Sequence, residues 1–300
     1  MPASPSVTDL ALDIVQQLLN GFLFGSSYAL IGIGFTMIFG VMDKLNLAFG
    51  VTALAGAYVG LGVFHLTRGP FVLVFVTAVV SSGLIGLVME LACFRWMPRD
   101  YPLAPLMATM GMLFFIDEVI SHATHGRPMA FPAPMGTAMM NVGPWLLRGD
   151  LGFMFLAALA VMGLLWVLVY RTRLGLATRA VSQQPVAAQL CGIALRRVNA
   201  SVFILTGMIG GVAGALIGSA VGNLSPLLSL PLTIKGLVTA VLGGLGSIPG
   251  AIAGGLLLGV VEYQALYFFG IGYRDMVTYL MLFAFLVFRP GGLLGRRAGH

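Results

Sequence analysis

Charged residues are scarce in this sequence of 300 residues, since Asp, Glu, Lys and Arg together make up 9% of it. An ordinary soluble domain has about 25%. Hydrophobic residues reach 59%, and apolar runs long enough to cross a bilayer recur from residue 14 to residue 288. The lack of polar surface excludes a soluble fold and leaves no room for a separate globular domain. We therefore predict one membrane domain over residues 1–300.

Lysine is almost absent, because only Lys44 and Lys235 occur and neither follows a glycine. This excludes a GxxxxGK[ST] phosphate-binding loop, so the chain does not hydrolyse ATP by such a loop. The sequence also lacks an HExxH motif and a Cys/His cluster, which argues against a catalytic metal site. We expect a non-enzymatic chain without a cofactor.

Cysteine is rare as well, with only Cys93 and Cys191 present. Neither falls in a segment that we assign to the cell exterior, so a disulfide framework is not expected. The formal net charge is +6, but the basic residues stand singly or in small groups between apolar runs. Because no stretch combines basic residues with exposed aromatics, we do not expect nucleic-acid binding.

Nine apolar stretches predict the membrane helices, of which the seventh and ninth are short for a full crossing. They fall at about 14–40, 45–66, 70–94, 103–122, 151–170, 200–222, 232–246, 248–268 and 275–288. The Gly-rich segment 243–250 either joins two crossings or breaks a re-entrant hairpin. The predicted fold is an all-α, polytopic transmembrane helical bundle with eight or nine spans, including this Gly-rich broken hairpin.

The basic residues predict the orientation, because loops rich in Lys and Arg are retained in the cytoplasm. One side holds eleven of them, namely Lys44, Arg95, Arg99, Arg171, Arg173, Arg179, Arg196, Arg197, Arg289, Arg296 and Arg297. The other side holds five, namely Arg68, Arg127, Arg148, Lys235 and Arg274. We expect a periplasmic N-terminus, a retained first helix and a cytoplasmic C-terminus. The outer loop 123–150 contains four prolines and should be irregular or carry short helices.

Polar residues inside the spans are candidates for a translocation path. Five of them fall in the first two spans: Ser26, Ser27, Tyr28, Thr36 and Asn46. Their hydrogen bonds can serve a solute or a neighbouring helix. Four acidic residues lie near span ends, where a snorkelling or capped carboxylate costs little: Glu90, Asp117, Glu118 and Glu262. Glycines at 210, 214, 218 and 222 line one helix face, which favours close helix packing or a path-lining role.

The segment 171–199 is the long basic loop on the predicted cytoplasmic side. Pro185 suits a first helical turn, Ala187 and Ala188 continue it, and Gly192 suits the position after its end. The sequence therefore predicts a short helix outside the membrane. This helix either rests on membrane lipid as an interfacial helix or docks on a cytoplasmic partner, and local physics favours neither.

Several segments together resemble the permease family of branched-chain amino-acid ABC importers, specifically the LivH-type subunit. They are QQLLNG at 16–21, GSSYAL at 25–30, GFT at 34–36, TRLG at 172–175, RAV at 179–181, AA at 187–188, GI at 192–193, VLGGLGSIPGA at 241–251 and RPGGLLG at 289–295. The resemblance covers nearly the whole chain. It implies a bacterial inner-membrane protein with a LivM-type second permease, two cytoplasmic ATP-binding subunits and a periplasmic solute-binding protein.

The same resemblance makes 171–199 a cytoplasmic coupling loop to the ATPase. The matching positions are Arg173, Gly175, Arg179, Ala187, Ala188 and Gly192. One segment departs from the family: where Asn-Phe-Ala-His-Gly is common, this chain has Asn46-Leu47-Ala48-Phe49-Gly50. Losing the imidazole leaves a more apolar site, which opens the substrate range from branched-chain amino acids to amides, urea and aromatic acids.

Two other classes of protein are consistent with many apolar spans. A self-sufficient secondary transporter would need coupling-ion ligands at the midplane and often shows an internal repeat. An integral-membrane enzyme would need convergent nucleophile, base or metal groups. Neither pattern is evident in the sequence, so we expect a translocation subunit in which partner ATPases drive the motion of the helices around a central path.

Overall fold

The computed structural model describes residues 7–97, 103–134, 139–142, 145–289 and 291–294. Arg99, Arg296, Arg297 and both chain ends, on which part of the orientation prediction rests, lie outside these residues. Within the described residues, nine helices are long and apolar enough to cross a membrane. They span 10–42, 49–67, 71–94, 104–124, 149–171, 195–221, 226–243, 248–269 and 271–288, which confirms the predicted helical bundle.

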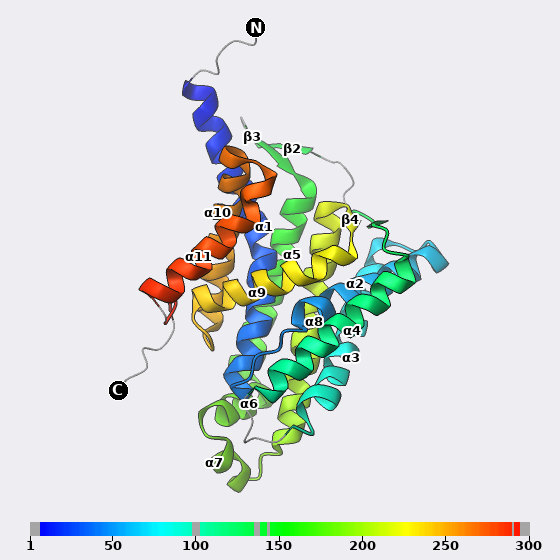
Figure 1. Cartoon of the computed structure of the whole chain (residues 1–300), viewed down its shortest axis with the longest axis vertical. Helices are drawn as coiled ribbons and strands as arrows, with labels where there is room; N and C mark the ends of the chain where they lie inside the picture. The colour runs from blue at the N-terminus through cyan, green and yellow to red at the C-terminus, as the bar shows by residue number, and fades with distance from the viewer. Residues whose placement is uncertain (1–6, 98–102, 135–138, 143–144, 290, 295–300) are drawn as a thin grey trace.

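The helices α1, α5 and α8 run lengthwise through the molecule, whereas α9 lies across them (Figure 1). The bounds of the helices are α1 Val7–Met42, α2 Phe49–Thr67, α3 Phe71–Met89, α4 Ala104–Thr124, α5 Gly149–Arg171, α6 Arg173–Gln183, α7 Pro185–Leu190, α8 Leu195–Val221, α9 Ser229–Gly243, α10 Ile248–Phe269 and α11 Arg274–Phe288. A π-helix, Glu90–Phe94, extends α3, and 3₁₀ turns precede α9 and α11 at Pro226–Leu228 and Ile271–Tyr273. The short helices α6 and α7 lie at the end opposite the start of α1 (Figure 1).

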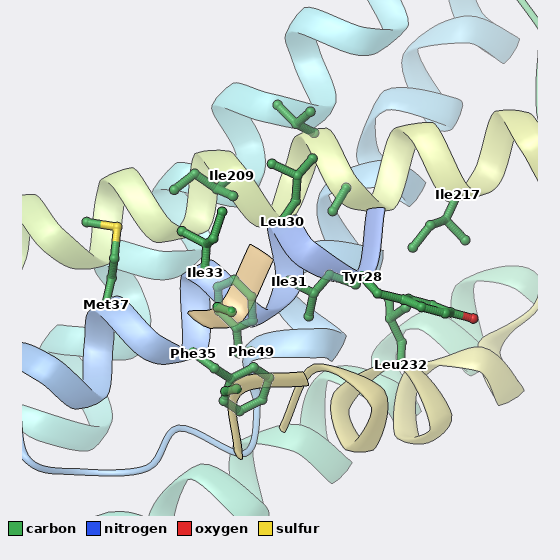
Figure 2. Close-up of a cluster of buried hydrophobic side chains, with 14 of the residues drawn as sticks. Tyr28, Leu30, Ile31, Ile33, Phe35, Met37, Phe49, Ile209, Ile217 and Leu232 are labelled. Carbon is green, nitrogen blue, oxygen red and sulfur yellow. The ribbon is translucent and has the colours of Figure 1, made fainter. Parts of the chain in front are cut away.

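The centre of the bundle is α1, with α8 beside it. Figure 2 shows apolar side chains of α1 meeting those of α2, α8 and α9, and Phe35 and Phe49 make an edge-on ring contact with centroids 5.2 Å apart. By contrast, few residues of α4, α5 and α11 are buried, as expected for helices facing lipid or a partner subunit. The core is therefore built by the helices that carry most of the glycine.

Glycines allow the central helices to approach closely. A Cβ atom at Gly25 would meet the backbone of Gly255 and Leu256, so α1 and α10 cross without side chains between them. In the predicted glycine row of α8, Gly210 and Gly214 face α2 and Gly218 faces Phe131, each at the short distances of close packing. Gly222 differs, because it ends α8 in the left-handed conformation with φ of 78°.

The Gly-rich segment 243–250 forms a tight turn between α9 and α10. Gly244 and Gly246 adopt positive φ, and the Ser247 hydroxyl accepts a hydrogen bond from the Gly250 amide at 3.2 Å. The amides of Leu293 and Leu294 donate to the carbonyls of Leu242 (2.8 Å) and Gly243 (3.0 Å). The C-terminal segment 291–294 thus caps the end of α9, which would otherwise leave buried carbonyls unpaired.

The outer loop differs from the prediction of irregular structure or short helices. Strand β1 (Met129–Ala130) pairs antiparallel with β4 (Asn223–Leu224), and β2 (Met139–Val142) pairs antiparallel with β3 (Trp145–Arg148). The first pair fastens the loop to the end of α8, where the Phe131 amide donates to the Gly222 carbonyl at 2.9 Å. The prolines excluded helix here, but backbone pairing between Ala130 and Asn223, which lie far apart in the chain, leaves no pattern in the local sequence.

Candidate functional sites: a docking helix and a buried charge cluster

The coupling segment folds as two short helices, α6 and α7, against the ends of α1, α5 and α8. The Thr172 hydroxyl caps α6 by accepting from the Gly175 amide at 3.2 Å. Gly175 lies against the carbonyls of Leu168 and Val169 and has no room for a side chain. A small apolar cluster anchors the pair of helices: Val41, Val181, Ala188, Leu195, Val198 and Val202.

The six predicted coupling residues divide into two groups. Gly175 and Ala188 are buried within the permease chain, so they position the helices. Arg173, Arg179, Ala187 and Gly192 are exposed, and the Arg179 guanidinium lies over the Tyr170 ring at 5.3 Å. Gly192 has a φ of 84° after the end of α7, as its sequence position indicated.

Two residues of α7 that the sequence analysis did not select are the most exposed apolar groups of this segment. Val186 is 65% exposed and Leu190 is 85% exposed. They are four residues apart and so share one face of the helix. That spacing was readable in the sequence, but only the burial of Ala188 shows that the opposite face is the one turned inward.

The predicted path residues do not form one site. Ser26 and Ser27 donate to carbonyls of their own helix, at 2.6 Å to Leu23 and 2.7 Å to Phe24. Asn46 is buried in the turn before α2 and accepts from the Ala48 amide at 3.1 Å. The buried Thr36 hydroxyl has no hydrogen-bond partner among the described residues. Of the five, Tyr28 is the one that the structure brings to a cluster of charged side chains.

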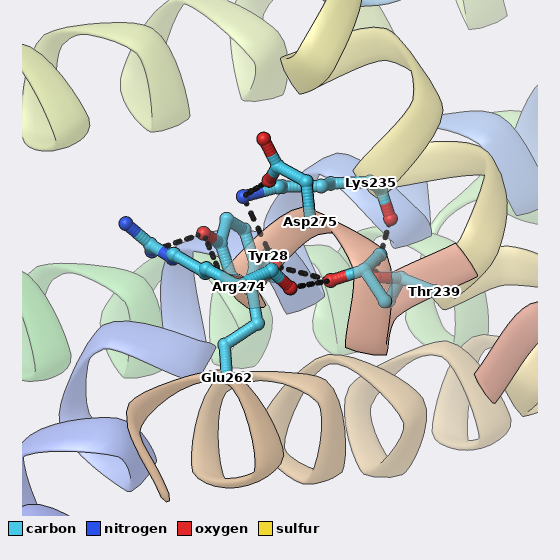
Figure 3. A network of polar contacts seen from close by, with 7 residues as sticks. Tyr28, Lys235, Thr239, Glu262, Arg274 and Asp275 are labelled. Carbon is cyan, nitrogen blue, oxygen red and sulfur yellow. Dashed lines mark hydrogen bonds and ion pairs between the residues drawn. The ribbon is translucent and has the colours of Figure 1, made fainter. Parts of the chain in front are cut away.

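This charge cluster joins α1, α9, α10 and α11 (Figure 3). It comprises Tyr28, Lys235, Glu262, Arg274, Asp275 and Thr278. Glu262 is its centre: Oε1 lies 3.0 Å from Lys235 Nζ, and Oε2 lies 2.8 Å from Arg274 Nε. The Tyr28 hydroxyl donates to Oε2 at 2.8 Å, and the Thr278 hydroxyl donates to Oε1 at 2.7 Å. Arg274 Nη2 in turn donates to the Tyr28 oxygen at 2.8 Å.

The cluster balances two cations against two carboxylates. The Glu262 side chain is 0% exposed, and a carboxylate so far from water is stable only when cations and hydrogen bonds surround it. The interpretation of Glu262 as a snorkelling or capped residue near a span end was therefore wrong. Lys235 and Arg274, which we had counted as outer-loop charges, are its partners. The missed signal was a rare lysine in the middle of an apolar stretch.

A small cavity of about 80 Å³ opens beside the cluster, and we call it the cationic cavity. It is lined by Phe24, Tyr28, Leu54, Gly214, Ile217, Val221, Leu228, Pro231, Leu232, Lys235 and Arg274. Its polar side chains come from the cluster, and aliphatic side chains supply most of the remaining wall. The cavity can thus present positive charge and apolar surface to the same small molecule.

A larger groove of about 710 Å³ lies between α2, α3 and α4 and is lined almost wholly by apolar side chains. Such a surface suits lipid chains or another hydrophobic helix. In the part of the chain that the structure describes, no three His, Cys, Asp or Glu residues gather as a metal site would require.

Comparison with known proteins gives concordant matches. Residues 17–286 match the family model described as "Branched-chain amino acid transport system / permease component". The permease protein BraD of a high-affinity branched-chain amino acid transport system of Pseudomonas aeruginosa is 33% identical, covering 94% of this chain and 96% of that protein. The permease protein LivH of the corresponding Escherichia coli system is 31% identical, covering 95% and 96%.

Among solved structures, a chain of PsaBC from Streptococcus pneumoniae, determined in complex with a Fab, superposes with a TM-score of 0.50 at 13% identity. The match covers 90% of each chain. At this identity the likeness concerns the fold alone.

Proposed function

Because the chain belongs to the family of branched-chain amino acid transport permease components, we propose that it is the membrane-spanning permease subunit of a bacterial ABC importer. Its solutes are branched-chain amino acids or related small molecules. The observation that carries this proposal is the family match over 270 residues (17–286) together with an exposed apolar helix on a chain without a phosphate-binding loop. Energy must then reach the chain from partner subunits.

The docking helix α7 is the proposed contact with a cytoplasmic ATPase. Its exposed side chains Val186 and Leu190, with Ala187 between them, suit insertion into a hydrophobic groove of that partner. Arg173 and Arg179 flank the helix with positive charge. The full assembly would contain a LivM-type second permease, two ATP-binding subunits and a periplasmic solute-binding protein, as the family resemblance implies.

The proposed orientation places α6 and α7 in the cytoplasm and the start of α1 in the periplasm of the inner membrane. Lys44 follows α1, Arg95 follows the π-helix that extends α3, and Arg173 and Arg179 lie in α6, in accord with retention of basic loops. The outer loop with strands β1 to β3 then faces the solute-binding protein.

Reconstitution tests the proposal directly. The chain would be produced with its second permease and ATP-binding subunits, inserted in liposomes, and supplied with the binding protein and radiolabelled leucine. We expect uptake that requires ATP and all subunits. Absence of uptake for leucine, isoleucine, valine, amides, urea and aromatic acids would contradict it.

One observation favours a second candidate, a self-sufficient secondary transporter: ionisable Lys235 and Glu262 lie within apolar spans, where coupling-ion sites occur. Both are paired within the chain, which weakens that interpretation. Uptake by this chain alone on an ion gradient, without ATP, would establish it.

A further inference from the structure

Lys235 bridges two carboxylates that differ sharply in exposure. Its Nζ lies 3.0 Å from Glu262 Oε1 and 3.0 Å from Asp275 Oδ1. The Glu262 side chain is fully buried, whereas the Asp275 side chain is 50% exposed. Figure 3 shows Asp275 approaching the lysine from the side opposite Glu262.

The two contacts therefore differ in how easily they are exchanged. Glu262 is also held by Arg274, Tyr28 and Thr278, and breaking a buried, multiply bonded ion pair is strongly unfavourable. The contact of Lys235 with Asp275 is easier to exchange. The Lys235 side chain is only 9% exposed, but the Asp275 side chain is half-exposed, so water can solvate this carboxylate when it leaves. Asp275 can leave Lys235 for another carboxylate, whereas Glu262 must stay.

The cationic cavity lies where such a carboxylate would enter. Its volume is about 80 Å³, which is enough to admit a small anionic group such as a carboxylate. Arg274 and Lys235 line its cationic wall, and the described contacts of Arg274 use only some of its five N–H donors. Ile217 and Leu232 supply apolar wall, and Val221 at the lining is 50% exposed.

We propose that the cationic cavity binds the carboxylate of the transported solute, and that Asp275 is the internal carboxylate that leaves Lys235 when the solute binds. The inference rests on the proposed function and narrows its solutes to carboxylates with an apolar side chain. Urea and simple amides lack the anion that would displace Asp275. No bond is made or broken, since one carboxylate replaces another.

Equilibrium binding tests this assignment without the solute-binding protein, which has its own solute site. The two permeases and ATP-binding subunits would be purified together in lipid nanodiscs and titrated with radiolabelled leucine. Isovalerate, which keeps the carboxylate, and leucinamide, which lacks it, would compete. We expect isovalerate to displace leucine and leucinamide not to.

Asp275→Asn is the decisive variant, because it removes the competing charge and leaves the cavity cations in place. We expect leucine to bind about fivefold more tightly, which is the factor that corresponds to releasing one partly exposed ion pair. Lys235→Met should abolish leucine binding. This variant is chosen because Glu262 keeps its contacts with Arg274, Tyr28 and Thr278.

Asp150→Asn is the matched control. Asp150 is paired with Arg148 at 3.4 Å, outside the cavity, so its change should leave the affinity for leucine as in the unaltered complex.

The outcomes separate the two proposals. Three results would overturn the carboxylate site, even if ATP-dependent uptake is normal. They are an unchanged affinity for leucine in Asp275→Asn, an equal tightening for leucinamide, and no saturable leucine binding to either the unaltered complex or Asp275→Asn. Failure of uptake overturns the proposed function, while tighter leucine binding in Asp275→Asn still supports the site. If Lys235→Met does not assemble, the Asp275→Asn and leucinamide results decide.

Discussion

Glu262 of α10 and Lys235 of α9 form an ion pair of 3.0 Å in which the carboxylate has no solvent exposure. Arg274, in the first turn of α11, completes the contact from the other side at 2.8 Å. One carboxylate thus holds the last three membrane helices together. Because α11 is otherwise the least buried of the nine spans, this cluster is a main attachment of α11 to the bundle.

Replacing Glu262 by Gln should destabilise the bundle by about 3–5 kcal/mol, because Lys235 and Arg274 would lose their buried counter-charge. The measurement is the thermal unfolding midpoint of the purified permease complex in detergent. Glu118→Gln is the control, since Glu118 is exposed on α4 and its change should have little effect. Equal midpoints for the two variants would show that the cluster does not contribute to stability.

Introducing a carboxylate on the exposed face of α7, as in Leu190→Glu, should abolish copurification of the ATP-binding subunits and ATP-dependent uptake. Membrane insertion and pairing with the second permease should stay normal, because Leu190 is 85% exposed in this chain. Ala188→Glu should instead reduce the yield of folded protein, because Ala188 is buried in the cluster that anchors α7. Full ATPase recruitment by Leu190→Glu would rule out this face as the docking surface.

The α1–α10 crossing predicts a contrast between two glycines. Gly255→Leu should prevent assembly, because a side chain there would meet the backbone of Ala29. Gly111→Leu, in α4, should be tolerated, since a Cβ at that position meets no atom within 4 Å. Size-exclusion profiles and expression yields compare the two variants. If Gly255→Leu assembles as well as Gly111→Leu, the close crossing is not required.

The native cysteines report the orientation without engineered sites. Cys191 is exposed at the end of α7 and Cys93 is buried. When the permease is produced without the ATP-binding subunits, which would cover α7, a membrane-impermeant maleimide should therefore label the chain in inverted membrane vesicles and leave it unlabelled in intact spheroplasts. Cys191→Ser should remove the labelling, which identifies the site. Labelling of Cys191 from outside spheroplasts would reverse the proposed topology.

The resemblance segments were found in sequence as separate motifs, and the structure shows why two of them occur together. The Gly-rich turn at 241–251 and the C-terminal segment at 291–294 meet, where the Leu293 and Leu294 amides donate to the last carbonyls of α9. The same segment could not be placed from sequence, because backbone hydrogen bonds between distant parts of a chain leave no local pattern. Ser26 and Ser27 show the converse, since their polarity suggested a path but their hydroxyls bond within α1.

The sequence by itself determined the membrane class, a bundle of eight or nine spans and the exclusion of a phosphate-binding loop, because hydropathy, span length and motif chemistry are properties of contiguous residues. It also indicated the short helix after Pro185. Only the tertiary structure decided which face of that helix is exposed and that Tyr28, Lys235, Glu262 and Arg274 form one cluster. Up to 246 residues separate these partners, and their pairing depends on how four helices pack and rotate against one another. In sequence, a buried charge is seen only as a charged residue within an apolar stretch. The packing of the helices determines which oppositely charged residue it contacts.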